Sequence, residues 1–207
     1  MQITTGIRSI LSSPFVYSTF QYIMGAHSFW KLFVQNILKL KGNELVLDIG
    51  CGPADILSYL PASAQYWGFD ISKAYIDKAT LKYGERGHFF CKYFEENDLA
   101  LLPKFDRVLL TGVLHHMEDD EASKVLKLAE IALKPNGMLI TVDPCLIEGQ
   151  NPIARFLILR DRGQNVRNES QYKQLLKNIF QSTKTQVVHK TWIPYTHCFM
   201  IGSNDTF

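Results

Sequence analysis

The chain has 207 residues, the size of one ordinary domain that can bury a hydrophobic core without disulfide or metal staples. Its composition of 46% hydrophobic, 12% aromatic and 20% charged residues excludes the disordered, collagen-like and coiled-coil classes. Twenty-two Lys and Arg against 20 Asp and Glu leave a net charge of +2, far from the basic bias that phosphate-driven nucleic-acid binding needs.

The N-terminal region, residues 1–42, is predicted to form helices that pack on the main domain. Pro14 suits the first turn of one helix and Gly25 suits its end. A second helix is expected from about Ser28 to Leu40, because apolar residues recur there at i, i+3 and i+4. A substrate lid is the alternative interpretation of this region.

Neither a leader peptide nor a membrane span is expected here. The first residues, MQITTGIRSI, lack a basic segment followed by an apolar one. Polar residues interrupt the apolar stretch 17–38, whereas a span needs about 20 mainly apolar residues. The cysteines lie dozens of residues apart, without the close spacing of a zinc or redox pair. We therefore expect a protein of a reducing compartment, the cytoplasm.

Short apolar segments alternate with helical ones between residues 43 and 143. The expected strands are residues 45–50, 65–70, 88–94, 105–114 and 138–143. The expected helices between them are ADILSYL, stopped by Pro61, KAYIDKATLKYG, stopped by Gly84, and EASKVLKLAEIALKPNG, ended by Pro135 and Gly137. Strands that alternate with helices indicate a doubly wound α/β fold with a parallel sheet.

The remaining region, residues 144–207, has a different pattern. A variable stretch is followed by an expected helix at 172–180 and by two strand-like segments, 184–193 and 196–202. Because only Pro194 and Tyr195 join these two segments, an antiparallel pair at the end of the sheet is expected. We interpret the whole chain as a single domain, without internal repeats or long linkers.

The strongest local signal is LVLDIGCGPADIL at residues 45–57. An apolar strand ends at Asp48, and Gly50 and Gly52 then allow a sharp turn that a ligand can approach closely. A helix beginning near Ala54 would direct its free N–H groups into the crevice beyond the strand, where open α/β sheets bind ligands.

The type of ligand follows from the charges around this turn. The dinucleotide pattern G-x-G-x-x-G/A would need Gly or Ala where Asp55 stands, and Asp48 would repel a pyrophosphate. Asp48 suits a cationic or amine-bearing ligand instead. Asp70, at the end of the next strand, can accept hydrogen bonds from both ribose hydroxyls, or it merely caps the following helix. A cationic ligand that carries a ribose indicates S-adenosylmethionine rather than NAD.

The order of motifs resembles a known family. VLDIGCG, GFDIS, FDRVLLTGVLHHMEDDE and ALKPNGMLITVD are together similar to the small-molecule branch of class I S-adenosylmethionine-dependent methyltransferases, over about residues 40–145. The resemblance implies a Rossmann-like sheet of seven mostly parallel strands, with helices on both faces and the last strand antiparallel. It also implies a cofactor-binding core at residues 43–143 and a substrate-side segment with the terminal strand pair at 144–207.

The resemblance implies a role for each matching position. The turn formed by Asp48, Gly50, Cys51 and Gly52 would hold the methionine part of the cofactor. Asp70 would bind the ribose, Ile71 would lie against the adenine, and the backbone of Thr111 would approach the methionine end. The acidic residue that usually meets the adenine is replaced by Tyr93 and Phe94, where the backbone of Phe94 is the expected contact.

Candidate catalytic residues follow the fourth and fifth strands. His115 and His116 are adjacent, so on an extended segment they would point to opposite sides. One of them is the leading candidate for a general base, with Asp143 second, because an unperturbed histidine pKa of about 6.5 suits proton removal near neutrality. No two-carboxylate metal cluster is evident, so no metal is expected.

The substrate side carries arginines and a short aromatic motif. Arg160 and Arg162 could grip a carboxylate or phosphate of the substrate, or they could lie on a solvated helix end with Asp161 paired locally. The RDRGxxxR pattern also resembles an element of this methyltransferase branch, as do Tyr195 and His197 in the IPYTH joint.

The resulting prediction is an S-adenosylmethionine-dependent methyltransferase that acts on a small-molecule acceptor, first by O-methylation. N-methylation is close behind, because an amine needs less help from a base. Other possibilities are a protein of the same fold that binds the cofactor without methyl transfer, and an enzyme of another reaction such as decarboxylation or cyclisation. No nucleic-acid partner is expected, and the sequence leaves the oligomeric state open.

Overall fold

The computed structural model describes residues 26–161, 163–190 and 195–206, which form two compact units. The first lies within Ile3–Phe94 and the second is Glu95–Phe207. The boundary between them therefore falls inside the predicted cofactor-binding core, residues 43–143. The expected first helix, between Pro14 and Gly25, lies outside the described residues.

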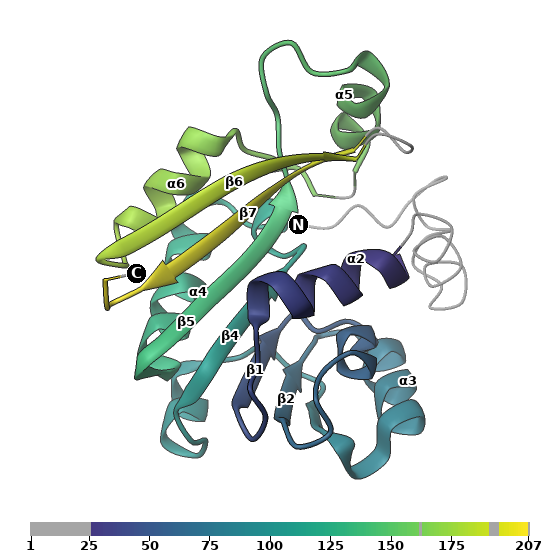
Figure 1. Cartoon of the computed structure of the whole chain (residues 1–207), viewed down its shortest axis with the longest axis vertical. Helices are drawn as coiled ribbons and strands as arrows, with labels where there is room; N and C mark the ends of the chain where they lie inside the picture. The colour runs from purple at the N-terminus through teal and green to yellow at the C-terminus, as the bar shows by residue number, and fades with distance from the viewer. Residues whose placement is uncertain (1–25, 162, 191–194, 207) are drawn as a thin grey trace. The chain divides into compact units, whose positions relative to one another are not determined.

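The first unit contains three parallel strands in the order β3-β2-β1, of which β1 and β2 are labelled in Figure 1. The strands are β1 (Leu45–Ile49), β2 (Gln65–Phe69) and β3 (His88–Phe90), so β3 is shorter than the predicted 88–94. The helices are α2 (Ala26–Phe33), which continues as the π-helical turn η2 (Val34–Leu38), and α3 (Lys73–Tyr83). Two short 3₁₀ turns complete the unit, η3 (Asp55–Ser58) and η4 (Gly84–Arg86).

The predicted helix ADILSYL, which was to begin near Ala54 and end at Pro61, is present only as a short 3₁₀ turn. Ala54 has a left-handed backbone with φ of 54°, and only the four-residue 3₁₀ turn η3 follows it. Gly52 also has a positive φ of 54°, so the residues just before η3 form turns and not the first turn of an α-helix. Helix α3 does form where it was predicted and ends at Gly84, whose φ is 54°.

The second unit contains four strands in the order β4-β5-β7-β6, side by side in Figure 1. The strands are β4 (Phe105–Thr111), β5 (Leu133–Pro144), β6 (Ser182–Lys190) and β7 (Tyr195–Ser203). Strands β4 and β5 are parallel, whereas β7 is antiparallel to both β5 and β6. The predicted antiparallel pair near the end of the chain is therefore confirmed.

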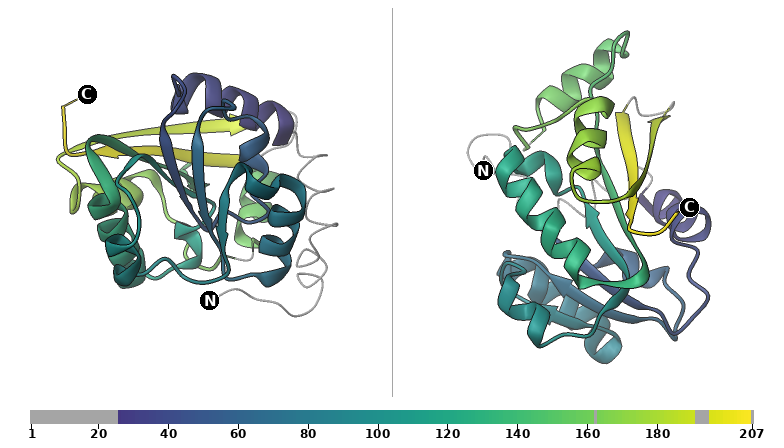
Figure 2. Two further views of the ribbon diagram at one scale, coloured as in Figure 1. Left: turned by 90° about the horizontal axis from the view of Figure 1, so that it is seen from below. Right: turned by 90° about the vertical axis from the view of Figure 1, so that its left-hand side faces the viewer.

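Three helices and two 3₁₀ turns accompany these strands. They are α4 (Asp119–Ala132), α5 (Pro152–Leu159), α6 (Glu169–Lys177), η5 (Glu96–Ala100) and η6 (Leu114–His116). Helices α4 and α6 contact each other and lie on the same side of the strands (Figure 2). Helix α4 ends earlier than predicted, because the chain already pairs with β4 from Leu133 onward, and Pro135 and Gly137 belong to β5.

Burial explains why these sequences form strands. Val108, Leu109 and Leu110 on β4 are all fully buried, as expected for a strand that is covered on both faces. The described residues contain seven strands in all, with β7 antiparallel, which confirms the predicted α/β class. No helix of the described residues is long and apolar enough to cross a bilayer.

Candidate functional site

The turn after β1 is tied to the end of β2. The backbone N–H groups of Gly50 and Cys51 both donate to the carbonyl oxygen of Phe69, at 2.7 and 3.0 Å. Gly50 and Gly52 have positive φ values of 76° and 54°, which glycine adopts without strain. A Cβ on Gly52 would have open space around it, so backbone conformation is what favours glycine there. The turn therefore lies against the carboxyl end of β2, with the N–H groups of Gly50 and Cys51 bonded to Phe69.

Asp70 joins the two predicted motifs of the first unit. Its Oδ2 accepts a hydrogen bond from the N–H of Gly52 at 2.9 Å, and its Oδ1 accepts one from the N–H of Ser72 at 2.8 Å. Burial raises the pKa of Asp70, and these two hydrogen bonds oppose the rise. Helix α3 is capped by Ser72, whose Oγ accepts from the N–H of Tyr75. Asp70 is thus not the cap of this helix, and its carboxylate lies against the glycine turn.

Asp48 has a buried oxygen that lacks a partner. The residue is 1% exposed, and its Oδ2 accepts a hydrogen bond from the hydroxyl of Tyr66 at 2.8 Å. Its Oδ1 is buried and has no hydrogen-bond partner among the described residues. Burial, partly offset by the Tyr66 hydroxyl, raises the pKa of Asp48 to about 7. A buried, unpaired carboxylate oxygen suits an ammonium or other donor group of a ligand.

The other predicted cofactor residues differ in exposure. Cys51 is buried, and burial raises the pKa of its thiol well above the usual value. Ile71 and Tyr93 are exposed, whereas the ring of Phe94 is buried against Phe69 at 5.2 Å between centroids. The ring of Phe94 is therefore enclosed, and the expected contact between its backbone and the adenine stays a prediction. Thr111 belongs to the second unit, where it ends β4.

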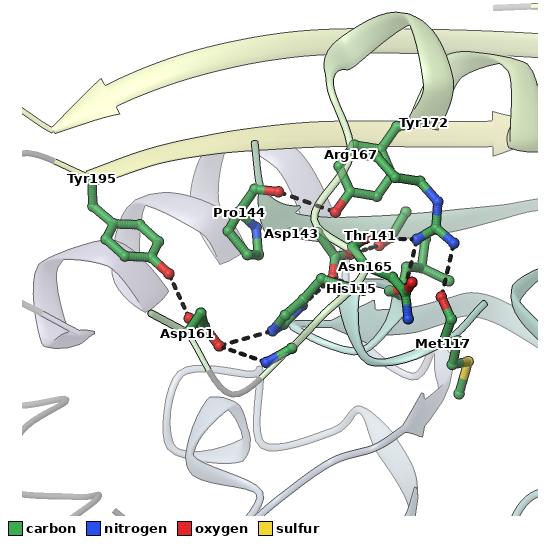
Figure 3. Close-up of polar contacts among 12 residues, drawn as sticks. His115, Met117, Thr141, Asp143, Pro144, Asp161, Asn165, Arg167, Tyr172 and Tyr195 are labelled. Atoms are coloured by element: carbon green, nitrogen blue, oxygen red, sulfur yellow. Dashed lines mark hydrogen bonds and ion pairs between the residues drawn. The ribbon is translucent and has the colours of Figure 1, made fainter. Parts of the chain in front are cut away.

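The second unit holds a cluster centred on His115 (Figure 3). Nδ1 of His115 lies 2.8 Å from Oδ1 of Asp143, and Nε2 lies 3.4 Å from Oδ1 of Asp161. The hydroxyl of Thr141 donates to the other oxygen of Asp143 at 2.9 Å. The hydroxyl of Tyr195 donates to Oδ2 of Asp161 at 2.6 Å. Asp143 is fully buried and His115 is 5% exposed, so a line of polar groups runs from the interior to the half-buried Tyr195.

His115 is held as a cation between two carboxylates. Burial alone would lower its pKa, but hydrogen bonds and charge from Asp143 and Asp161 raise it to about 9. The same pairing, together with the hydroxyl of Tyr195, outweighs burial and brings the pKa of Asp161 well below its usual range. At neutral pH both ring nitrogens of His115 therefore carry protons, and the ring has no lone pair to accept another.

The expectation that His115 and His116 point to opposite sides is wrong. It assumed an extended segment, whereas both residues lie on the 3₁₀ turn η6. Their ring centroids are 4.0 Å apart with an angle of 38° between the planes. His116 is half-buried and Asp143 is enclosed by its hydrogen bonds to His115 and Thr141. The three predicted catalytic residues are thus brought together. His115 and Asp143 are bonded to each other in a buried pair, whereas His116 is half-buried beside them.

The segment 161–167 packs against η6 and donates hydrogen bonds to its carbonyl groups. A Cβ on Gly163 would lie 1.9 Å from Cδ2 and 2.7 Å from the carbonyl oxygen of His115, so only glycine allows this approach. The N–H of Asn165 donates to the same carbonyl oxygen at 2.9 Å. Arg167 donates to the carbonyl oxygens of Leu114 and Met117 at 2.9 and 2.8 Å. We call this segment the 161–167 strap; of its residues, Arg162 lies outside the described part of the chain.

The predicted substrate residues are placed differently from one another. Arg160 is exposed, with its guanidinium 4.3 Å from the ring centroid of Phe156. Tyr195 and His197 lie at the start of β7 with ring centroids 4.9 Å apart. Asp161 does not pair only locally, as one alternative supposed, since it contacts both His115 and Tyr195.

Three residues of these two clusters were not predicted as site residues. Tyr66 carried no signal in the sequence, and Asp161 and Gly163 appeared only within the RDRG pattern, because their roles are set by contacts with residues remote in the chain. No group of three or more His, Cys, Asp or Glu side chains that could hold a metal ion occurs in the described part of the chain.

The glycine turn, the partly buried Asp70 and the Asp48 oxygen that has no partner among the described residues lie at the carboxyl ends of β1 and β2, the place where open α/β sheets bind ligands. Residues 47–139 match a family model described as a methyltransferase domain. This match covers somewhat less than half of the chain and supports the predicted class I methyltransferase and, at the level of that family, its cofactor S-adenosylmethionine.

Individual proteins are similar to the chain at lower coverage. An uncharacterised Synechococcus protein is 32% identical over 105 residues, 47% of this chain and 25% of that protein. An N-terminal Xaa-Pro-Lys N-methyltransferase from Xenopus laevis is 27% identical over 128 residues, 58% of this chain and 57% of that protein. Human N-acetylserotonin methyltransferase, solved with S-adenosylmethionine, has a TM-score of 0.66 at 19% identity and covers 95% of this chain and 58% of that one.

These comparisons differ in what they establish. The solved structure shows a shared fold, the Rossmann-like methyltransferase fold that the sequence predicts. The chain spans between 25% and 60% of the length of the curated relatives it matches.

Proposed function

We propose that this chain transfers a methyl group from S-adenosylmethionine to a small-molecule acceptor, with a hydroxyl group as the first candidate. The buried Oδ1 of Asp48, which has no partner among the described residues, is the observation that carries the proposal. It lies in the same strand–turn segment as Gly50 and Gly52, and the backbone of that turn is bonded to Asp70. A carboxylate for an ammonium group and a second carboxylate for ribose hydroxyls are the chemistry that this cofactor requires.

In this proposal the residues of the first unit bind and orient the cofactor. Asp48 accepts a hydrogen bond from its amino group, Asp70 accepts from the ribose hydroxyls, and Ile71 and the backbone of Phe94 lie against the adenine. When bound, S-adenosylmethionine supplies an activated methyl group on its sulfonium. The protein then has mainly to place and orient the acceptor, since proximity and orientation provide much of the acceleration in such a reaction.

The residues of the second unit bear on the acceptor. We propose that His116 is the general base that removes the proton of a hydroxyl acceptor. His115 is held doubly protonated and Asp143 is enclosed by its hydrogen bonds, so neither is the better candidate. The backbone of Thr111 remains the proposed contact to the methionine part of the cofactor. Arg160 and Arg162 stay candidates for contact with an acidic group elsewhere on the acceptor.

N-methylation is the second candidate. It is supported by the similarity to an N-terminal Xaa-Pro-Lys N-methyltransferase, which also leaves a protein acceptor as an alternative to a small molecule. An amine needs less help from a base than a hydroxyl, which fits a cluster whose central histidine is already protonated. A protein that binds the cofactor without transferring methyl is the third possibility.

Calorimetric titration with S-adenosylmethionine, S-adenosylhomocysteine and NADH tests the proposal. Binding of the first two without NADH supports it, and release of S-adenosylhomocysteine with hydroxyl or amine acceptors then separates the candidates. Binding of NADH alone would refute the cofactor assignment.

A further inference from the structure

We propose that helix α5 docks the second unit onto an anionic lipid surface. This interaction goes beyond the proposed methyl transfer and does not depend on it. Its basis is a set of exposed apolar side chains on α5, which lie beside two arginines that form no ion pair with a described residue. Figures 1 and 2 show α5 beyond the carboxyl end of β5, at the margin of this unit.

Most apolar side chains of α5 point away from the protein. Of its eight residues only Ala154 and Ile158 are buried, and a spacing of four places them on one side of the helix. The large apolar side chains that remain exposed, with their exposed fractions, are Ile153 (60%), Phe156 (54%), Leu157 (37%) and Leu159 (58%). A contiguous apolar surface of this kind marks a site of contact with a partner or a membrane.

These side chains form a broad face and not a narrow stripe. Ile153, Phe156 and Leu157 share one row at i, i+3 and i+4, and Leu159 follows Phe156 in the neighbouring row. A groove on another protein holds a helix by apolar anchors at i, i+3, i+4 and i+7, but the last of these positions is Arg160 here. A flat lipid interface accepts a broad apolar face that carries arginines.

The charge beside this face selects an anionic partner. Between Glu148 and Asp161 the only charged side chains are those of Arg155 and Arg160, and both are exposed. The guanidinium of Arg155 makes no contact with a described residue, and that of Arg160 lies 4.3 Å from the ring centroid of Phe156. The carboxylate of Asp161 is already bonded within the cluster described above. The two positive charges are therefore available to phosphate groups of lipids.

Helix α5 is formed before any partner binds. The side-chain oxygen of Asn151 accepts hydrogen bonds from the N–H groups of Ile153 and Ala154 at 2.9 and 3.3 Å, and Pro152 occupies the first turn. Docking therefore does not have to order the helix. The long arginine side chains can reach the headgroups while their stems stay along the apolar face.

A second copy of this chain fits the face less well. In a two-fold dimer each α5 would meet another α5, which brings the arginines of both copies together without a carboxylate between them. An anionic bilayer instead provides a phosphate for each guanidinium and an apolar layer for Phe156 and Leu159.

The test is sedimentation of the full chain with sucrose-loaded vesicles. Vesicles of phosphatidylcholine with about 30% phosphatidylglycerol should bind the chain about tenfold or more tightly than vesicles of phosphatidylcholine alone. Raising the NaCl concentration from about 0.1 M to about 0.5 M should weaken this binding severalfold, because salt screens the two exposed arginines.

Two double variants separate the charged part of the face from the apolar part. Arg155→Gln with Arg160→Gln should weaken binding to the anionic vesicles about tenfold or more, since each arginine near the surface contributes about fivefold. Phe156→Ser with Leu159→Ser should weaken it about tenfold or more through the loss of apolar insertion. The changed side chains are exposed, so urea denaturation should show that both variants are folded.

Matched controls change exposed side chains elsewhere in the same unit. Lys124→Gln removes a positive charge of α4, and Leu101→Ser removes a leucine that is 81% exposed. Both should bind the anionic vesicles within about twofold of the wild type, because they lie outside the docking face.

The outcomes separate this inference from the proposed function. No binding to anionic vesicles, equal binding to neutral ones, or α5 variants that bind as the controls do would overturn the inference. A dimer in sedimentation velocity that Phe156→Ser with Leu159→Ser dissociates would assign the face to a second copy and would overturn it as well. A chain that binds lipid but no S-adenosylmethionine would refute the proposed function alone.

Discussion

Removing the side chain of Arg167 should destabilise the second unit strongly. The side chain is 7% exposed, and it donates to the carbonyl oxygens of Leu114, Met117 and Asn165. The bond to Leu114 is buried, so losing it leaves an acceptor that water cannot reach, which costs about 1–3 kcal/mol. The other two bonds are part-buried and add about 1 kcal/mol each, while the bond to the exposed Asp119 adds little.

We therefore expect Arg167→Ala to lower the free energy of unfolding by about 3–5 kcal/mol, measured by urea denaturation at pH 7. Arg167→Lys should recover only part of this, because one ammonium cannot span carbonyl groups that a planar guanidinium reaches together. The matched control is Arg160→Ala, which removes an exposed arginine stacked on Phe156 and should cost about 1 kcal/mol or less. If Arg167→Ala and Arg160→Ala had the same small effect, the anchoring role of Arg167 would be refuted.

Four further predictions concern single groups. Gly163→Ala should lower the free energy of unfolding by about 3 kcal/mol in urea denaturation, because the added Cβ would lie 1.9 Å from a ring carbon of His115. The control Gly149→Ala has open space around its Cβ but a φ of +65°, and should lower it by about 1–2 kcal/mol. Equal losses in the two variants would contradict the steric reasoning. The pKa of His115 is raised from 6.5 to about 9, so its contribution to stability is fully present below pH 6.5 and is lost as the pH rises through 9. Unfolding measured from pH 6 to 10 should show this decline, smaller in Asp161→Asn, and a flat profile in the wild type would argue against it. Asp70→Ala should weaken S-adenosylmethionine binding by about 1–3 kcal/mol in calorimetry, and unchanged affinity in a folded variant would remove Asp70 from the site. The pKa of Asp48 is raised to about 7, and a bound cationic ligand would lower it. Binding of S-adenosylmethionine near pH 6.5 should therefore release protons, which calorimetry in two buffers of different ionisation enthalpy can detect. The release should vanish in Asp48→Asn.

Much of the fold follows from local pattern. Strand β4 reads as a continuous apolar segment because it is covered on both faces, and helix α3 begins after Ser72 and ends at Gly84, where the sequence predicts. The errors lie at turns. The segment after Ala54 has the composition of a helix, but positive φ values at Gly52 and Ala54 leave only a 3₁₀ turn. The end of α4 was misplaced because pairing with β4 extends β5 back to Leu133, past Pro135.

The sequence by itself predicted the methyltransferase fold, the glycine turn after β1 and the carboxylate at the end of β2, which the structure brings into contact. Gly50, Gly52 and Asp70 could be singled out because a tight turn and a carboxylate at a strand end need particular residue types at a fixed spacing. The protonation of His115 was decided only by the tertiary structure. Its partners are remote in the chain, with Asp143 28 residues away, and Asp161 is in turn bonded to Tyr195, a further 34 residues on. A histidine without charged neighbours has a pKa near 6.5, which predicts a base. Folding places two carboxylates beside His115, and they raise its pKa to about 9, so that the ring is a cation at neutral pH.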